Sequence, residues 1–391
     1  MIDTNERKNC NGCKMCKDAC PKSAISFETD KQGFWYPIVD YDKCVKCKIC
    51  VNTCPQINQI KCRTNFPNVY AAWSQDENIR LGSTSGGMFY EFAKHILDND
   101  GYVEGCVYDK DFKGAHQTII HSLDELKPLM VSKYVQSDSE DIYKKTKEVL
   151  KTKKTVLFVG SPCQCAALQA FLKIEYDNLY ICDFLCRGEN SPKAHKKYVE
   201  YLENKYNGRI TNLRSKDKRN GWERFGQAAT FDNGKEYFLP HEKDLRVVAY
   251  HHGNIMVRES CLNCKFKHIP RDAADITLGD FWGIKKEEVN DIDKGISLIF
   301  TNTAKGQNLF DSIKNRIEYI EKDLEFAKAG NPAIYESATC NSNRETFLNT
   351  LDQAPFDELV TKYRSYPPKG VKAICWKITN KLKGLVRRIF K

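Results

Sequence analysis

The chain of 391 residues exceeds one typical domain and can bury a core of ordinary size, so its 18 cysteines do not indicate a small disulfide scaffold. The net charge of +10 is concentrated near the end of the chain, where residues 369–391 carry eight Lys or Arg and no acid. A nucleic-acid-binding domain is usually basic on a folded face, so this distribution argues against nucleic acid as a partner.

No stretch of the sequence approaches the eighteen apolar residues that a transmembrane helix requires. The first residues, MIDTNERKNC, lack the basic and apolar regions of a signal peptide. Thiolate-bound clusters, which the cysteine pattern predicts, also fit a reducing compartment. We therefore expect a cytoplasmic protein.

Two cysteine runs with the same spacing open the chain, CNGCKMCKDACP at 10–21 and CVKCKICVNTCP at 44–55. The pattern C-x2-C-x2-C-x3-C-P is that of bacterial two-cluster ferredoxins, in which the fourth cysteine of each run ligates the other cluster. Zinc is the alternative, but it is bound by isolated sets of four ligands. Two identical runs that each end in proline therefore favour two [4Fe–4S] clusters. The predicted ligands are Cys10, Cys13, Cys16 and Cys54 for the first cluster, and Cys44, Cys47, Cys50 and Cys20 for the second.

The segment between the runs, ISFETDKQGFWYPIVDYDKC, is predicted to form a β-hairpin and a linker. From about residue 69 to 185, strand-like and helix-like patterns alternate, which indicates an α/β core with some parallel pairing. Strands are expected at VYAAW, YVEGCVY, TVLFVG and LYICDFLC, and helices at SGGMFYEFAKHILDN and CAALQAFLK. Further along, the Asn-Gly turn in GQAATFDNGKEYFLP predicts a hairpin, and ADITLGD and ISLIFTN predict strands. Residues from about 304 are expected to be mostly helical.

A further group of cysteines belongs to the core. Cys163 follows a strand at the start of a helix, and Cys186 ends the next strand. If these strands are parallel neighbours, both thiols lie at the carboxyl edge of the sheet, where open α/β sheets bind ligands. The pair Cys261 and Cys264, spaced C-x2-C, would complete four ligands for a third [4Fe–4S] cluster. Alternatively, Cys163 and Cys186 are small buried core residues, and spacing alone leaves both interpretations open.

These segments resemble a known family. GSPCQCAAL, CRGENSPKAHKKYVEYL, CLNCKF, ADITLGDFWG and KGISLIFTNTAKG are similar, in the same order, to the beta subunit of coenzyme F420-reducing hydrogenases and dehydrogenases. The resemblance runs from about Val69 to Gly306, and the relatives include electron-input subunits of F420H2 dehydrogenases and a plant reductase of chlorophyll derivatives. It implies FAD, a [4Fe–4S] cluster close to the flavin, and hydride exchange at the flavin. Arg187 departs from the family pattern, since many members have histidine there.

The resemblance also suggests where FAD is held. LGSTSGGMFYEFAKHIL passes from a Gly/Ser-rich turn directly into a helix, and free N–H groups at a helix start suit a pyrophosphate. Such a turn alone usually only caps a helix, but family members have a comparable Gly-Gly helix start near FAD. Lys133, in a segment that also matches the family, would hold negative charge on the reduced ring or on phosphate, or else be a solvated surface lysine. The predicted phosphate cradle consists of Ser83, Thr84, Ser85, Gly86 and Gly87.

A flavin exchanges both single electrons and hydride, so it joins one-electron clusters to two-electron substrates. The sequence therefore predicts an FAD- and iron–sulfur-dependent oxidoreductase, with ferredoxin or another redox protein as partner and a biosynthetic intermediate as substrate. No catalytic residue is identified. One alternative is an electron-input subunit of a larger complex that uses an F420-like deazaflavin. The other is a non-catalytic electron relay without flavin.

The predicted fold is an α+β two-cluster ferredoxin unit at 1–62, followed at 69–366 by an α/β flavin-binding core with a mixed sheet and a mostly helical C-terminal end. The basic tail at 367–391 has apolar residues at helical spacing. Such an amphipathic helix can bind the interface of an anionic membrane, or it can dock on its own domain with its charges solvated. Peripheral contact with the inner face of the membrane is therefore one of two expectations for the tail.

Overall fold

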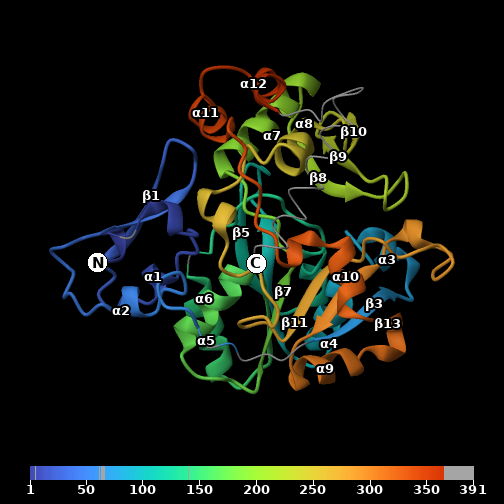
Figure 1. Cartoon of the computed structure of the whole chain (residues 1–391), viewed down its shortest axis with the longest axis horizontal. Helices are drawn as coiled ribbons and strands as arrows, with labels where there is room; N and C mark the ends of the chain where they lie inside the picture. Colours follow the sequence, from blue (N-terminus) through green and yellow to red (C-terminus); the bar gives the residue numbers. More distant parts are fainter. Residues whose placement is uncertain (5, 61, 63–66, 140, 365–391) are drawn as a thin grey trace, which may run out of the picture.

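The computed structural model describes residues 1–4, 6–60, 62, 67–139 and 141–364. An N-terminal unit projects from one side of a larger core (Figure 1). Within the described residues, no helix has the length and apolar character needed to cross a membrane. The basic tail predicted at 367–391 lies outside the described residues, which end at Arg364.

The N-terminal unit consists of the two cysteine runs and the antiparallel hairpin between them, which confirms the predicted hairpin. Each run contains one short helix, and each helix follows a lysine in the left-handed region, Lys14 with φ 60° and Lys48 with φ 61°. The two runs therefore fold back on themselves in the same way. The elements are α1 (Met15–Asp18), β1 (Ile25–Thr29), β2 (Trp35–Val39) and α2 (Ile49–Asn52).

The core is organised by a mixed sheet whose strands, in the described part of the chain, have the order β13-β3-β12-β11-β7-β6-β4-β5. The central strands β11, β7, β6 and β4 are parallel, and the strands on either side of them pair antiparallel. The parallel pairing expected from the alternating pattern is therefore confirmed. The bounds are β3 (Asn68–Ser74), β4 (Tyr102–Tyr108), β5 (Ala115–Ile120), β6 (Val156–Gly160), β7 (Leu179–Phe184), β11 (Ile276–Asp280), β12 (Ser297–Thr301) and β13 (Ile317–Lys322).

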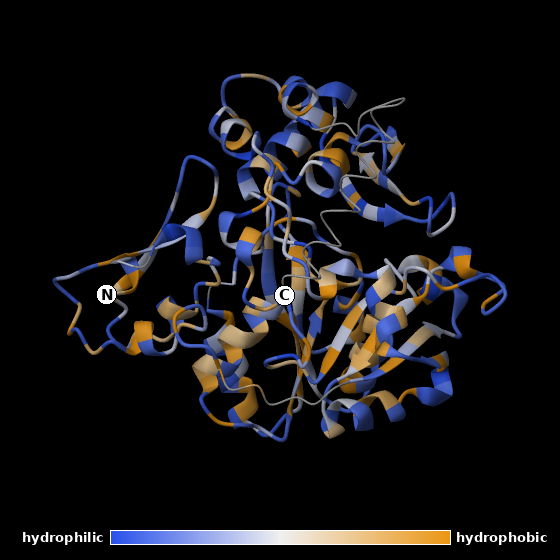
Figure 2. Ribbon diagram, viewed as in Figure 1, coloured by the Kyte–Doolittle hydropathy of each residue, from blue (hydrophilic) through white to orange (hydrophobic). Residues whose placement is uncertain are grey.

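Helices cover both faces of this sheet. Leu157 of β6 packs on one face with α4 and α9, and its neighbour Phe158 packs on the other face with α5 and α6. Side chains alternate across a strand, so a central strand covered on both sides needs apolar residues at successive positions. Figure 2 shows this hydrophobic character on the central strands. The helices are α4 (Met88–Asp98), α5 (Ile142–Lys151), α6 (Pro162–Leu172) and α9 (Ala304–Asp311).

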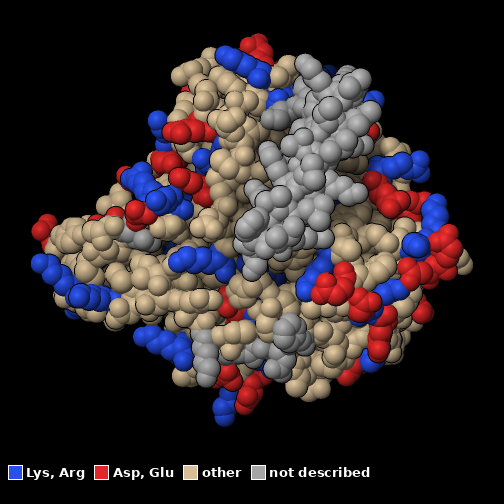
Figure 3. All heavy atoms as spheres, in the orientation of Figure 1, with Lys and Arg blue, Asp and Glu red and all other residues tan. Residues whose placement is uncertain are grey.

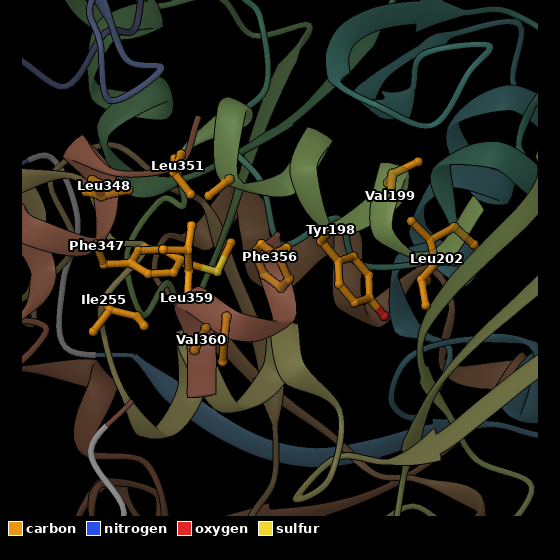
Figure 4. Packing of buried hydrophobic residues seen from close by; sticks show 14 of the residues in the cluster. Tyr198, Val199, Leu202, Ile255, Phe347, Leu348, Leu351, Phe356, Leu359 and Val360 are labelled. Carbon is orange, nitrogen blue, oxygen red and sulfur yellow. The ribbon is translucent and has the colours of Figure 1, made fainter. Parts of the chain in front are cut away.

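A smaller sheet of order β10-β9-β8 lies at the top of the view in Figure 1, together with α7, α11 and α12. Tyr198 of α7, Phe347 of α11 and Phe356 of α12 pack in one buried hydrophobic cluster (Figure 4). Phe34 and Tyr36 from the N-terminal hairpin belong to the same cluster, so the hairpin is part of the core packing. The bounds are α7 (Pro192–Tyr206), β8 (Ile210–Asp217), β9 (Gly226–Phe231), β10 (Glu236–Pro240), α11 (Arg344–Asn349) and α12 (Phe356–Tyr363).

Other short helices of the described chain are α3 (Glu77–Gly82), α8 (Leu245–Val247), a π-helix (Val248–His252) and α10 (Leu324–Gly330), and several 3-10 turns lie between the elements. The prediction of a mostly helical segment after residue 304 is wrong in one respect, because β13 adds a strand beside β3. Its apolar residues Ile317 and Ile320 are three positions apart, which matches a helical period. Only Ile317 is buried, because β13 lies at the edge of the sheet, and the alternation typical of a strand is therefore weak.

Arg258 fixes the N-terminal unit to the core. Its guanidinium is fully buried and donates from Nε to Cys10 O at 2.6 Å and from Nη2 to Trp35 O at 3.0 Å. Nη1 donates to Gln136 Oε1 at 3.1 Å, and the group lies 4.6 Å from the centre of the Tyr36 ring. A buried cation is tolerated only when its donors are satisfied, and here the acceptors come from both parts of the molecule.

Replacing Arg258 by Met is expected to loosen this junction, because the carbonyls of Cys10 and Trp35 lose their buried donor. We expect a loss of roughly 3 kcal/mol in local stability, which corresponds to about a hundredfold faster amide exchange in the Cys10 loop and the hairpin. These amide exchange rates are measured by hydrogen exchange on the anaerobic holoprotein. Arg209→Met, at an exposed arginine, is the control. Equal exchange in native protein and R258M would show that the guanidinium does not hold the junction.

Candidate functional site

A large cavity lies at the carboxyl ends of the parallel strands, where open α/β sheets bind ligands. Its volume is about 360 Å³, within the range of small-molecule and cofactor sites. The loops after β6, β7 and β11 all contribute to it, through Ser161, Cys186 and Trp282 among others. The expectation that the ends of these neighbouring strands meet at one edge is therefore confirmed.

The predicted phosphate cradle forms one wall of this cavity. Ser83, Thr84, Ser85 and Gly87 line it, and Gly87 precedes α4, whose first N–H groups have no acceptor within the helix. Gly86 does not line the cavity. Its N–H donates to Ser297 Oγ at 3.0 Å, so Gly86 attaches the loop to β12 instead.

Lys218 holds the same loop from behind. Its buried Nζ donates to three backbone carbonyls, those of Arg80 at 2.6 Å, Ser85 at 2.7 Å and Lys294 at 2.7 Å. Gly295 lies against this contact, since a Cβ there would be 2.6 Å from Ser85 O. The Ser/Gly loop is therefore a fixed part of the wall, although Lys218 is far from it in the sequence.

Lys133 also lines the cavity, which favours the predicted role at the flavin over that of a solvated surface lysine. Its Nζ donates to Pro128 O and lies 6.0 Å from the centre of the Tyr108 ring. Burial lowers the pKa of Lys133 to about 8, because the charged ammonium is poorly solvated there. A negatively charged group in the cavity would counteract this effect and stabilise the protonated form.

The four core cysteines come together although they lie on three separate segments. Cys163, Cys186, Cys261 and Cys264 line one small cavity. Two of the sulfurs already accept hydrogen bonds from the backbone, Cys186 Sγ from Gly188 N–H at 3.3 Å and Cys261 Sγ from Glu189 N–H at 3.4 Å. N–H groups directed at cysteine sulfur are a feature of iron–sulfur sites.

The donor set fits a polynuclear iron–sulfur cluster. Burial raises the pKa of the Cys163, Cys261 and Cys264 thiols, and it raises the pKa of Cys186 to about 11 against the opposing effect of the Lys267 ammonium. Four buried thiolates would be unfavourable without a cation among them. Among the described residues, no three His, Cys, Asp or Glu side chains are grouped as ligands of a single ion would be. In a cubane cluster each thiolate binds a different iron, so close convergence on one point is not required.

The ferredoxin cysteines also form two sets. Cys20, Cys44, Cys47 and Cys50 line one small cavity, as predicted for the second cluster. In the other set, the Cys13 thiol is buried near Cys54 and Cys10, and its pKa is raised by burial and by the charges of these two neighbours. Cys54 comes from the second run, which agrees with the predicted exchange of the fourth ligand.

The first ferredoxin set lies next to the core set. Asn11, inside the first cysteine run, lines the same small cavity as Cys163 and Cys264. Tyr143 Oη donates to Cys13 O at 3.0 Å from α5. The second ferredoxin set shares no lining residue with the core cavity in the described part of the chain. The order along the molecule is therefore second set, first set, core set and large cavity.

Several residues of the site were not identified from the sequence. Glu189 lines both cavities, and burial raises the pKa of its carboxyl to about 7. Lys216 and Asp280 form a partly buried ion pair at the large cavity, where Trp222 Nε1 also donates to Asp280 Oδ1 at 3.1 Å. His251, for which the sequence gives no motif, lines the cavity too. Glu189 and Asp280 belong to segments that carry the family resemblance, CRGENSPKAHKKYVEYL and ADITLGDFWG, but neither residue was assigned a role from the sequence.

Two family models match the chain. Residues 153–325 match the model for the C terminus of the coenzyme F420 hydrogenase/dehydrogenase beta subunit, and residues 9–57 match the 4Fe-4S dicluster domain. Among solved structures, a chain of the F420-reducing [NiFe] hydrogenase complex from Methanosarcina barkeri is similar with a TM-score of 0.48 and 16% identity. That match covers 71% of this chain and 93% of the other.

Curated relatives match the N-terminal unit. An uncharacterized ferredoxin of Methanocaldococcus jannaschii is 38% identical over 50 residues, which is 13% of this chain and 64% of that protein. The ferredoxin-type protein NapF of Haemophilus influenzae is 42% identical over 43 residues, 11% of this chain and 24% of that protein. The chain thus spans less than two thirds of the length of either relative. It joins a segment that matches the 4Fe-4S dicluster domain to a core in which residues 153–325 match the C terminus of the coenzyme F420 hydrogenase/dehydrogenase beta subunit.

Proposed function

We propose that the chain is an FAD- and iron–sulfur-dependent oxidoreductase that exchanges electrons between a redox protein and a hydride donor or acceptor. The observation that carries this proposal is a shared wall. Cys186, Gly188, Glu189 and Ala333 line both the cysteine cavity and the large cavity. Cys186, a proposed cluster ligand, thus lies at the surface of a space large enough for part of a cofactor, with a helix start and the partly buried Lys133 on its walls.

The groups that these residues would hold have complementary chemistry. FAD takes up or releases a hydride and also passes single electrons, which are all that [4Fe–4S] clusters carry. In the proposed arrangement, Cys163, Cys186, Cys261 and Cys264 hold the core cluster, and the eight ferredoxin cysteines hold two more.

The other residues of the large cavity would bind and orient the flavin. The N–H groups at the start of α4 and the hydroxyls of Ser83, Thr84 and Ser85 would bind the FAD pyrophosphate. The Lys133 ammonium would stabilise negative charge in the cavity. Since Lys216 is paired with Asp280 at the wall, it contributes little net charge and is better suited to holding the shape of the cavity.

The third cluster can be tested by iron analysis with a matched pair of cysteine variants. Native protein reconstituted anaerobically should contain about twelve irons per chain, four for each cluster, and Cys186→Ser should contain about eight. Cys165→Ala is the control, because Cys165 is buried beside the site and its Sγ contacts Gly160 O and Cys182 O rather than the cysteine cavity. The third cluster would be ruled out if C186S kept the full iron content, or if both variants lost iron equally.

The flavin site can be tested at Thr84, which lines the cavity and accepts a hydrogen bond from Ser132 N–H at 3.0 Å. Thr84→Asp keeps this acceptor but sets a carboxylate against the phosphates, so FAD affinity should fall at least tenfold, about 1.4 kcal/mol. Thr84→Asn has nearly the same shape without the charge and should retain FAD. Gly87→Asp is a poorer choice, because φ of +92° strains any side chain there. FAD content is measured after anaerobic purification, and equal retention by T84D and T84N would place the cradle elsewhere.

The same preparation separates the alternatives. A native protein that binds iron but no flavin would be a relay, whereas reduction of an F420-like deazaflavin at the bound FAD would identify an F420-using electron-input subunit. The specific substrate is otherwise open to a screen of hydride acceptors with the holoprotein.

A further inference from the structure

The two cysteine runs have the same backbone but different surroundings. Position for position, Gly12 in the first run corresponds to Lys46 in the second, and Lys14 corresponds to Lys48. All four residues have positive φ, 67° and 55° for the first pair and 60° and 61° for the second. The loops therefore have the same local course, and their differences lie in the side chains.

The first run faces the core. A Cβ on Gly12 would lie 2.7 Å from Gln136 Nε2 and 2.9 Å from Arg258 Nη1, so a side chain there would have to displace one or both groups. Lys14 is buried and its Nζ lies 2.7 Å from Asp138 Oδ2. The first run thus packs against the core, and its cysteines are partly or fully buried, whereas a partner protein needs an exposed surface.

The second run faces solvent. Cys47 is exposed, and Val45 is 59% exposed. Lys22, Lys46 and Lys48 are also exposed, and within the described residues none of the three forms an ion pair. Figure 3 shows Lys and Arg atoms along the lower edge of the projecting unit, in the region where Figure 1 places α2.

Acidic groups near the second run only partly offset this charge. Asp40 pairs with Lys43 at 2.7 Å, and Asp3 accepts a hydrogen bond from Tyr41 Oη at 3.1 Å. Asp42 is exposed and adds one negative charge. The surface around Cys47 is therefore positive, with apolar residues such as Val45 within it.

We infer that the loop of the second run is the docking surface for a one-electron carrier protein with an acidic face, such as an acidic ferredoxin. This inference rests on the proposed function, because it concerns the partner that supplies or removes electrons. The exposed lysines complement an acidic face, and the exposed cysteine and valine allow close approach at the set of thiols farthest from the large cavity. Charge complementarity of this kind mainly accelerates encounter and fixes orientation.

The reaction at this surface is the transfer of one electron. In each encounter the carrier is oxidised by one electron and the chain is reduced by one, or the reverse, and no bond is made or broken. The exposed loop is short, so the contact should be small and transient, as is usual for redox encounters. It should also weaken as ionic strength rises.

The test uses the reconstituted holoprotein and a reduced acidic [2Fe–2S] ferredoxin as probe. Two quantities are measured at low and high salt: the affinity for immobilised ferredoxin, and the rate at which the visible absorbance of the holoprotein bleaches in stopped flow. The triple variant Lys22→Glu, Lys46→Glu, Lys48→Glu should lower both the affinity and the rate at low salt by at least about tenfold. Bleaching by dithionite, which needs no docking surface, should be unchanged.

The matched control replaces by Glu three exposed lysines on the surface of the larger domain, Lys145, Lys243 and Lys286. None of them forms an ion pair in the described part of the chain. It makes the same change in net charge and should alter ferredoxin affinity by less than about twofold. If the glutamate triple loses iron, the same three lysines replaced by Gln keep the test valid, with a smaller loss of affinity expected.

Three results would overturn the inference: ferredoxin affinity unchanged by both the glutamate and glutamine triples, equal weakening by the core control, or no effect of salt. Binding of anionic phospholipid vesicles that is lost in the triple variants, while ferredoxin binding is kept, would assign the surface to a membrane instead. Failure of the proposed flavin chemistry would appear separately, as bleaching of iron–sulfur absorbance by ferredoxin in a protein without FAD.

Discussion

The burial of one guanidinium determines how the two parts of the molecule are joined. Arg258 is fully enclosed, and its acceptors lie on the first cysteine run, on the hairpin and on the core. Such a group cannot be left half satisfied without a large desolvation cost, so the junction forms as a unit. As a result, Asn11 lies in the wall of the cysteine cavity of the core. The distance between the first ferredoxin set and the core set is therefore fixed by packing rather than by a linker.

A second constraint determines the shape of the large cavity at the edge of the sheet. Parallel strands end at one edge of the sheet, and the loops that leave them must diverge, which leaves room between them. Here that room is bounded by residues that sequence distance would not associate, such as Lys218 behind the Ser85 loop and Lys216 beside Asp280. Both lysines sit where β8 meets the large sheet, so the smaller sheet shapes the cavity although it contributes few residues to its lining.

Much of this arrangement follows from the sequence, for physical reasons that are specific to each part. The two ferredoxin sets were predictable because their motif has a fixed spacing, whereas the core set was suggested by the ends of neighbouring strands and by the family resemblance. The central strands were predictable because burial on both faces imposes continuous apolar runs. By contrast, β13 was missed because an edge strand has only one residue, Ile317, that is buried. Lys216 and His251 were missed because their importance comes from which elements meet at the cavity, and no local pattern records it.

The comparison of Gly12 with Lys46 shows how two copies of one motif can differ, one packed on the core and the other exposed to solvent. Left-handed backbone costs a non-glycine residue about 1 kcal/mol or more, whereas glycine adopts it freely. Glycine is favoured at position 12 because a side chain there would have to displace the buried ends of Gln136 and Arg258. At position 46 the space is open, glycine would be locally more favourable, and lysine is nevertheless present with φ of 55°. Local stability therefore does not explain Lys46, and neither does an ion pair within the described residues. What remains is the charge that it displays to solvent beside Cys47, on the side of the unit that faces away from the core.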